Sequence, residues 1–148
     1  MNKDTNVAKI KNLGRELRVL FRKRYSDKMP KEISRVEGRF LGYIYDYQDE
    51  GVISSDLVRA FQLKKSTVSE TLSSLEKKGF IEFTRSEEDG RKKTIRLGKK
   101  GIDHQKEVAP VIDEFDSILE NALNEEEQAQ FEAIYARLMN AIKEKEEA

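Results

Sequence analysis

One stretch decides the fold of this chain: residues 62–101 read QLKKSTVSETLSSLEKKGFIEFTRSEEDGRKKTIRLGKKG. Its first part predicts a helix over about residues 66–78, because Val68, Leu72 and Leu75 recur at helical spacing on one face. Gly79 follows at the place where a left-handed residue commonly ends a helix. The opposite face of this helix is small and polar, and it consists of Ser66, Ser69, Glu70, Ser73 and Lys77.

A shorter helix is expected just before this one. It covers about residues 55–61, after the very short apolar piece Val52-Ile53, with Ser54, Ser55 and Asp56 as candidate N-cap residues. Only a short polar link separates the two helices. Two short helices joined by a tight turn, the second with an exposed polar face, are typical of a helix-turn-helix.

A β-hairpin is expected after the second helix. Residues 80–85 and 94–97 alternate between apolar and polar side chains, and Asp89-Gly90 between them is a turn signal. An isolated hairpin is marginally stable in water, so this one should pack beside the two helices. Helix, helix and hairpin in this order predict a winged helix. The apolar face of the hairpin consists of Ile81, Phe83, Ile95 and Leu97.

Two amphipathic helices are expected before this region. The first covers about residues 6–25 and Pro30 stops it, and the second opens at Ser34, with Glu37 as its capping-box partner, and ends at Gly51. The inward face of the second helix is predicted to consist of Val36, Phe40, Tyr43, Ile44 and Tyr47.

Two further helices are expected at the C-terminal end. They cover about residues 99–122, with Pro110 as a possible bend, and 125–145, which Asn124 and Glu127 cap. The predicted fold class is therefore mainly α with a small β-hairpin wing, a winged helix-turn-helix flanked by N- and C-terminal helices.

Composition excludes several classes of protein. The chain has 148 residues, of which 38% are charged, no cysteine and a single histidine, His104. Disulfides and thiolate chemistry are therefore impossible, and one histidine offers little basis for a metal site or a catalytic triad. We expect no cofactor and no enzymatic activity, since phosphate-binding loops and nucleophile elbows are also missing. His104 itself is expected at the surface or in an interface.

The chain shows no sign of a membrane partner. It has no run of 18 apolar residues and no hydrophobic segment at its N-terminus. These features favour a cytoplasmic protein.

Charge is distributed unevenly although it sums to zero. Residues 51–101 carry 12 basic and 7 acidic side chains, whereas residues 102–148 carry 4 basic and 13 acidic ones. A basic middle segment favours a polyanionic partner. The alternative interpretation is an unevenly charged surface that is merely solvated.

The winged-helix region resembles the MarR family of bacterial transcription regulators. Residues 66–81 are similar to the family's recognition helix and the strand that follows. Asp89, Arg91, Leu97 and Gly101 fit the spacing of its wing signature. The helix order and the total length are also similar over nearly the whole chain.

This resemblance implies a domain organisation. It suggests a single MarR-like domain over residues 1–148, with a winged helix-turn-helix DNA-binding region at 34–101. Residues 1–33 and 102–148 would then form a helical dimerisation region.

Two residues depart from the family pattern. Gly98 stands where relatives commonly have a threonine, and it should cap the next helix slightly less well. Glu70 stands where a basic residue is common. Its carboxylate should weaken non-specific binding to phosphates, and it could accept a hydrogen bond from cytosine N4. The alternative for Glu70 is a solvated helix residue.

The polar helix face and the wing supply the candidate DNA contacts. Hydroxyls suit phosphate oxygens and base edges, and lysines and arginines suit phosphates. The resemblance implies that Arg91 enters the minor groove and that Asp89 orients it, while formation of the turn alone is the other role open to Asp89. The candidates are Lys64, Lys65, Ser66, Thr67, Ser69, Glu70, Ser73, Arg85, Asp89, Arg91, Lys92 and Lys93.

The outer helices carry more apolar surface than a winged helix can cover. A homodimer would bury these stripes and would place two recognition helices about one DNA turn, ~34 Å, apart on a pseudo-palindromic operator. Intramolecular packing in a monomer is the alternative.

A candidate effector pocket lies on the helix that follows Ser34. Gly38 and Gly42 are one turn apart, and Tyr45 shares their side. We expect a small-molecule effector there, since the resemblance implies one, and close approach of another helix is the alternative explanation for the glycines.

These observations predict a sequence-specific, double-stranded DNA-binding regulator that acts as a homodimer. The resemblance implies a ligand-responsive repressor, although repressors and activators use the same contacts. A winged-helix protein–protein adaptor is the alternative function. The basic wing tip and the hydroxyl-rich helix favour DNA over a protein partner.

Overall fold

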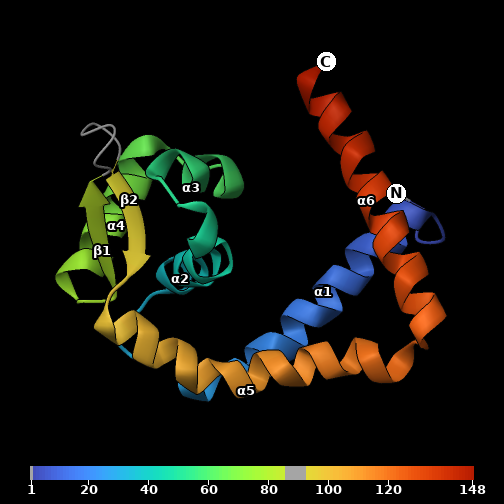
Figure 1. Ribbon diagram of the computed structural model, residues 1–148, viewed down its shortest axis with the longest axis horizontal. Coiled ribbons are helices and arrows are strands. Elements are labelled where there is room, and N and C mark those ends of the chain that lie inside the picture. The colour runs from blue at the N-terminus through green and yellow to red at the C-terminus, as the bar shows by residue number, and fades with distance from the viewer. Residues whose placement is uncertain (1, 86–92) are drawn as a thin grey trace. The chain divides into compact units, whose positions relative to one another are not determined.

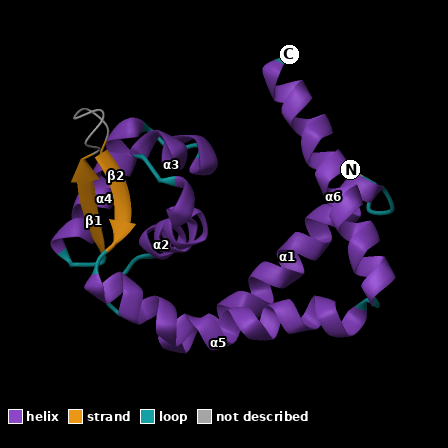
Figure 2. Ribbon diagram, in the orientation of Figure 1, coloured by secondary structure: helices purple, strands orange, loops and turns teal. Residues whose placement is uncertain are grey.

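The computed structural model describes residues 2–85 and 93–148 of the chain. In this part the chain forms six α-helices, two short 3-10 helices and one antiparallel β-hairpin (Figures 1 and 2). Its internal contacts divide it into two compact units, Met1–Ala109 and Pro110–Ala148. Among the described residues, no helix is long and apolar enough to cross a membrane.

The middle of the chain has the predicted order of helix, helix and hairpin, and Figure 1 shows these elements gathered into one body. This order, together with the helix before it, confirms the winged helix. The elements are α2 (Arg35–Tyr47), α3 (Ser54–Phe61), α4 (Lys65–Lys77), β1 (Ile81–Arg85) and β2 (Lys93–Leu97).

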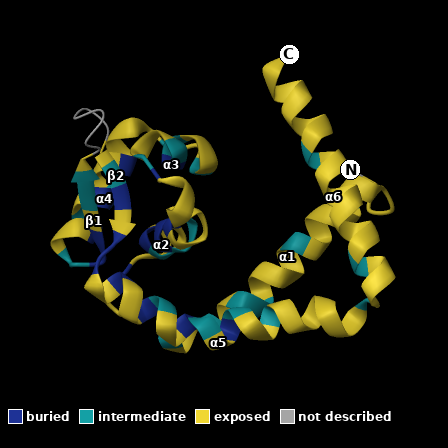
Figure 3. Cartoon of the chain, in the orientation of Figure 1, coloured by how far each residue is buried: buried dark blue, intermediate teal, exposed yellow. Residues whose placement is uncertain are grey.

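The hydrophobic core lies inside this winged helix. Every buried member of the core cluster falls between Ile33 and Leu97. Val68, Leu72 and Leu75 of α4 are buried, as their spacing predicts. Figure 3 shows the dark blue, buried positions concentrated in this body and at the start of α5 (Lys99–Ala122).

The hairpin has the predicted face, and its first strand begins one residue later and its second strand one residue earlier than predicted. Ile81 pairs with Leu97 and Phe83 with Ile95, so the four apolar side chains share one face. Val52 adds an isolated bridge to the outer edge of β2, where the Ile95 N–H donates to the Val52 carbonyl over 2.7 Å. The extended piece before α3 is thereby fixed to the hairpin.

The α2 helix corrects part of the predicted inward face. Phe40 and Ile44 are fully buried, as predicted, and Tyr43 packs half-buried against the core. Val36 and Tyr47 are instead 37% and 43% exposed. The buried positions that replace them are Leu41 and Glu37.

The start of α3 also differs from the prediction. The helix begins at Ser54, one residue earlier than expected, and Ile53 is the N-cap residue. Asp56 supports this end from inside the first turn, because its carboxylate accepts a hydrogen bond from the Ile53 N–H over 2.9 Å.

The first helix, α1 (Asn6–Tyr25), has the predicted bounds and is followed by a 3-10 turn, Ser26–Lys28. None of its residues is buried. Its last residue, Tyr25, is hydrogen-bonded through its hydroxyl to Nε2 of His104 in α5.

His104 is buried, which corrects the first of the two positions expected for it, at the surface or in an interface. Burial lowers its pKa, and the nearby Glu107 opposes this only in part. Burial likewise raises the pKa of Tyr25 to about 12. At neutral pH both partners are therefore uncharged, which allows the pair to sit between two helices.

The remaining helices follow the predictions closely. Within α5, Val108 and Val111 are buried. The last helix, α6, covers Glu125–Glu147, and it has the predicted cap, in which Asn124 and Glu127 exchange hydrogen bonds. A second 3-10 turn, Gln48–Glu50, follows α2.

A glycine-rich joint connects the hairpin to α5. Gly79 has a positive φ of 83°, which confirms the predicted left-handed end of α4. The Gly98 N–H donates to the Phe80 carbonyl over 2.8 Å. A Cβ on Gly98 would lie 2.7 Å from the Gly79 carbonyl oxygen, and one on Gly101 would lie 2.3 Å from that of Phe80. Only glycine fits at these two positions.

Candidate nucleic-acid interface

The exposed side of α4 is the central element of the candidate site. The helix begins after the N-cap residue Lys64, and a tight turn with Gln62 in the left-handed region joins it to α3. Its apolar side is buried in the core, so its other side must face outward. We call this side the polar face, and it consists of Ser66, Ser69, Glu70, Ser73 and Lys77, all of them exposed.

A buried carboxylate holds the C-terminal end of α4 against α2. Glu37, which is 6% exposed, accepts hydrogen bonds from the Ser74 hydroxyl over 3.0 Å and from Lys78 Nζ over 3.1 Å. It also accepts from the backbone N–H of Ser34, with which it forms the predicted capping box. Lys78 Nζ donates in addition to the Glu32 carbonyl.

These bonds decide the charge of Glu37. Burial alone would raise its pKa, but the hydrogen bonds from Ser34, Lys78 and Ser74 outweigh burial and lower the pKa below its ordinary value. The carboxylate is therefore ionised at neutral pH. It fixes one end of α4 through contacts that lie off the polar face.

Sequence reasoning missed most of this network. It identified Glu37 only as a helix cap, because the partners Ser74 and Lys78 lie about 40 positions further along the chain. A carboxylate inside an otherwise apolar helix pattern is the one local signal that could have indicated a buried partner.

Positive charge gathers at two places around α4. Lys64 and Lys65 are exposed at its N-terminal end, and Arg85 and Lys93 are exposed at the far end of the hairpin. Among the described residues, no ion pair joins any of these four side chains to a carboxylate. The sequence-predicted cations of the described part are thus available to an external anion.

The hairpin cations are also placed against each other. Arg85 and Lys93 are direct cross-strand partners. Like charges in this position destabilise a hairpin. A bound anion between or beside them would remove that repulsion. The wing residues Asp89, Arg91 and Lys92 lie outside the described residues.

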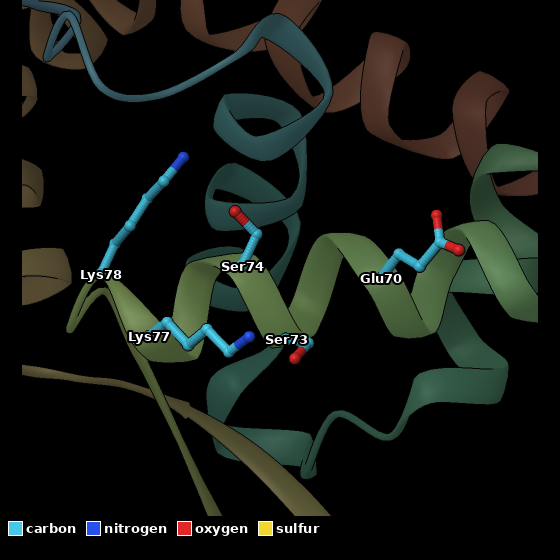
Figure 4. Close-up of a pocket in the computed structure, with 5 residues that line it drawn as sticks. All are labelled: Glu70, Ser73, Ser74, Lys77 and Lys78. Atoms are coloured by element: carbon cyan, nitrogen blue, oxygen red, sulfur yellow. The ribbon is translucent and has the colours of Figure 1, made fainter.

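A shallow depression runs along α4 (Figure 4). Its rim is formed by Glu70 and Ser73, two of the predicted DNA contacts, and by Ser74, Lys77 and Lys78. Figure 4 shows four of these side chains projecting from α4 and the fifth, that of Lys78, from the residue that follows the helix. The depression is therefore the exposed surface of α4 itself rather than an enclosed cavity.

The three candidate effector residues have different surroundings. A Cβ on Gly38 would lie 2.7 Å from the end of the Met29 side chain, so close packing explains this glycine. A Cβ on Gly42 would meet nothing within 4 Å. Tyr45 is 38% exposed. The side of α2 that carries Gly42 and Tyr45 is therefore open in the single chain.

A family model described as the MarR family matches residues 32–92, which is the region from the start of α2 to the wing. No curated protein matches the sequence.

Several solved structures of MepR from Staphylococcus aureus are similar to nearly the whole chain. MepR in its DNA-binding conformation is 27% identical with a TM-score of 0.75, and the match covers 93% of this chain and 98% of that one. The MepR–DNA complex is 26% identical with a TM-score of 0.73, covering 96% and 99%. MepR bound to ethidium bromide is 28% identical with a TM-score of 0.59, covering 96% and 99%.

The order of elements, the helix-turn-helix with its hairpin, the family match and the likeness to MepR over almost its full length agree with one another. Residues 32–92 thus match the MarR family of transcriptional regulators, and the chain as a whole has the winged helix-turn-helix fold of MepR.

Proposed function

We propose that this protein is a transcriptional regulator that binds double-stranded DNA sequence-specifically, with α4 in the major groove. The observation that carries this proposal is the exposed polar face of α4, which lies between two groups of cations that have no carboxylate partner among the described residues. A helix of this kind fits the major groove, and hydroxyls and cations are the groups that bind phosphates and base edges.

The residues predicted from the sequence would contact different parts of the DNA. Lys64, Lys65, Arg85 and Lys93 bind phosphates, and Ser66, Thr67, Ser69, Glu70 and Ser73 face the groove. Arg91, with Lys92 and Asp89, would contact the DNA from the wing. The structure of MepR in complex with DNA supports this assignment, because MepR is 26% identical to this chain.

We further propose that the protein binds as a homodimer to a pseudo-palindromic operator. The large apolar side chains exposed on α1 and α6 of the single chain support this. A two-fold axis would pair the two recognition helices with half-sites about one DNA turn apart.

The experiment is a selection from random-sequence duplex DNA with the full-length protein at physiological salt. We expect an enriched pseudo-palindrome with half-site centres ~34 Å apart. Replacing both Lys64 and Lys65 by glutamine should weaken binding to all sequences and reduce the salt slope by about 3.6, since the homodimer loses four phosphate contacts and each contributes about 0.9. Lys143→Gln with Lys145→Gln, the same charge change on α6, is the control. Retention of DNA without a shared motif would favour the protein–protein adaptor.

We also propose that a small molecule regulates binding, and that it binds beside Gly42 and Tyr45. The open space at Gly42 supports a site there, and MepR has been solved with ethidium bromide bound. Ethidium fluorescence, titrated with protein in the absence of DNA, tests the site. Gly42→Leu should fill the space and abolish the fluorescence change, whereas Gly42→Ala should keep it. A Gly42→Leu variant that binds ethidium like the wild type would rule the site out.

A further inference from the structure

The polar face of α4 carries one side chain whose chemistry differs from the rest. Ser66, Ser69 and Ser73 are short and can both donate and accept hydrogen bonds. Glu70 stands among them as the only long side chain before Lys77, and its carboxylate only accepts. Whatever Glu70 contacts must therefore be a donor.

Glu70 also points almost directly away from the core. At about 100° per residue, it lies almost opposite the mean direction of Val68, Leu72 and Leu75, which are buried. Figure 4 shows its carboxylate extended from the helix and apart from Ser74 and Lys78, the residues that bind Glu37. Among the described residues, no hydrogen bond or ion pair engages the Glu70 carboxylate.

The major groove offers such a carboxylate one suitable base. Cytosine presents the N4 amino group as a donor, whereas guanine presents two acceptors and thymine an acceptor beside a methyl group. Adenine presents a donor, but its N7 acceptor lies next to it and repels a carboxylate. Cytosine is thus the base that offers a donor without a neighbouring acceptor.

We propose that Glu70 is a specificity-determining residue that accepts a hydrogen bond from cytosine N4 in each half-site of the operator. This inference rests on the proposed function, because it requires α4 to lie in the major groove. The inference goes beyond that function by naming the base that Glu70, near the middle of α4, recognises.

The negative charge of Glu70 disfavours DNA sequences that offer it no donor, in addition to favouring those that do. Phosphates repel a carboxylate, so Glu70 lowers the affinity for every sequence that offers it no donor. Lys65 near one end of the helix and Lys77, two turns beyond Glu70, keep the helix attached to the backbone. The lysines therefore supply attraction to any DNA, and Glu70 restricts it to sites with a cytosine.

The test is a selection of binding sites with the wild type, Glu70→Gln and Glu70→Ala. The wild type should require cytosine at one position of each half-site. Glu70→Gln should prefer adenine there, because a glutamine amide pairs with adenine N6 and N7, and Glu70→Ala should accept any base. Replacing that cytosine should lower wild-type affinity at least about fivefold and Glu70→Ala affinity less than about twofold.

Glu76→Gln is the matched control. Glu76 lies exposed on the same helix but on its flank, so the variant makes the same charge change away from the polar face. It should bind all sequences more tightly and keep the wild-type motif.

Two outcomes separate the inference from the function beneath it. If Glu70→Gln and Glu70→Ala select the wild-type motif with a uniform gain in affinity, as in Glu76→Gln, then Glu70 reads no base and the inference is overturned while the regulator remains. If the wild type itself selects no motif, the proposed function fails, and the role of Glu70 fails with it.

Discussion

Gly98 shows how a single position can be misjudged from a family pattern. By comparison with relatives it is a weaker helix cap, because it replaces a threonine. The structure gives a steric reason for the glycine, since a Cβ there would lie 2.7 Å from the Gly79 carbonyl oxygen, which is backbone and cannot swing away. The nearby Gly101 is under the same restriction against Phe80.

Restoring the family residue should therefore destabilise this protein. We expect Gly98→Thr to lower the free energy of unfolding by about 1–3 kcal/mol, because the backbone of Gly79 must move. Gly42→Ala is the opposite case, since its Cβ meets nothing in the middle of α2. It should raise the free energy of unfolding by about 0.4–1 kcal/mol. Urea denaturation of the two variants measures both changes in the free energy of unfolding. A Gly98→Thr variant more stable than the wild type would show that residue 98 has room for a side chain beside Gly79.

Side chains with distant partners marked the limit of sequence reasoning at this scale. The burial of Val68, Leu72 and Leu75 followed from their spacing alone. The burial of His104 did not, because its partner Tyr25 lies 79 positions away. Neither residue carries a local signal of the other, and a lone histidine in a charged helix reads as a surface residue.

The elements themselves were more predictable than their faces. The helices came out within a residue or two of their predicted ends, since caps such as Asn124 with Glu127 are local. The exception is α2, which ends at Tyr47 and passes into a 3-10 turn before Gly51, where its end was predicted. The predicted inward face of α2 was partly wrong, because hydropathy assigns Val36 to the core and Glu37 to solvent. Glu37 is buried instead because Ser74 and Lys78, at the end of α4, donate hydrogen bonds to its carboxylate. The exposure of the candidate DNA contacts on α4 could be predicted, because the residues of its polar face lie close together in the sequence. That these residues bind DNA stays a prediction.

The contact between α2 and α4 should make stability depend on pH. The pKa of Glu37 is lower in the folded protein than its ordinary value of 4.5, so its contribution is complete above that value and is lost as the pH falls through the folded pKa. Glu37→Gln should flatten this acid loss. Thermal melting between neutral pH and pH values below 4.5 measures it.

A control separates Glu37 from the other carboxylates of the chain. Glu76→Gln changes an exposed carboxylate on α4 and should melt like the wild type across the whole range. An acid limb of equal steepness in Glu37→Gln and the wild type would contradict the role of Glu37.

For the molecule as a whole, the exposed apolar side chains of α6 decide the assembly. Phe131, Ile134, Tyr135, Leu138 and Ile142 are 46–56% exposed in a single chain. A stripe of this kind is a burden in an isolated monomer and suits an interface.

A charge within this stripe should separate the homodimer. Leu138→Glu places a carboxylate in the proposed interface without disturbing a buried core, because Leu138 is 46% exposed. Sedimentation equilibrium should give twice 17.2 kDa for the wild type and 17.2 kDa for the variant. Asn140→Glu, on the opposite side of α6, should remain dimeric. A wild type of 17.2 kDa at micromolar concentration would refute the dimer.

The glycine joint at the start of α5 has a mechanical consequence. Gly98 and Gly101 touch the backbone of Gly79 and Phe80 with no side chain between, and the Lys100 N–H also donates to the Gly79 carbonyl over 3.3 Å. A joint made of backbone atoms has no rotamers to absorb a torque. A rotation of the first turn of α5 is therefore transmitted directly to the C-terminal end of α4 and to the first residues of the hairpin, and all three move together.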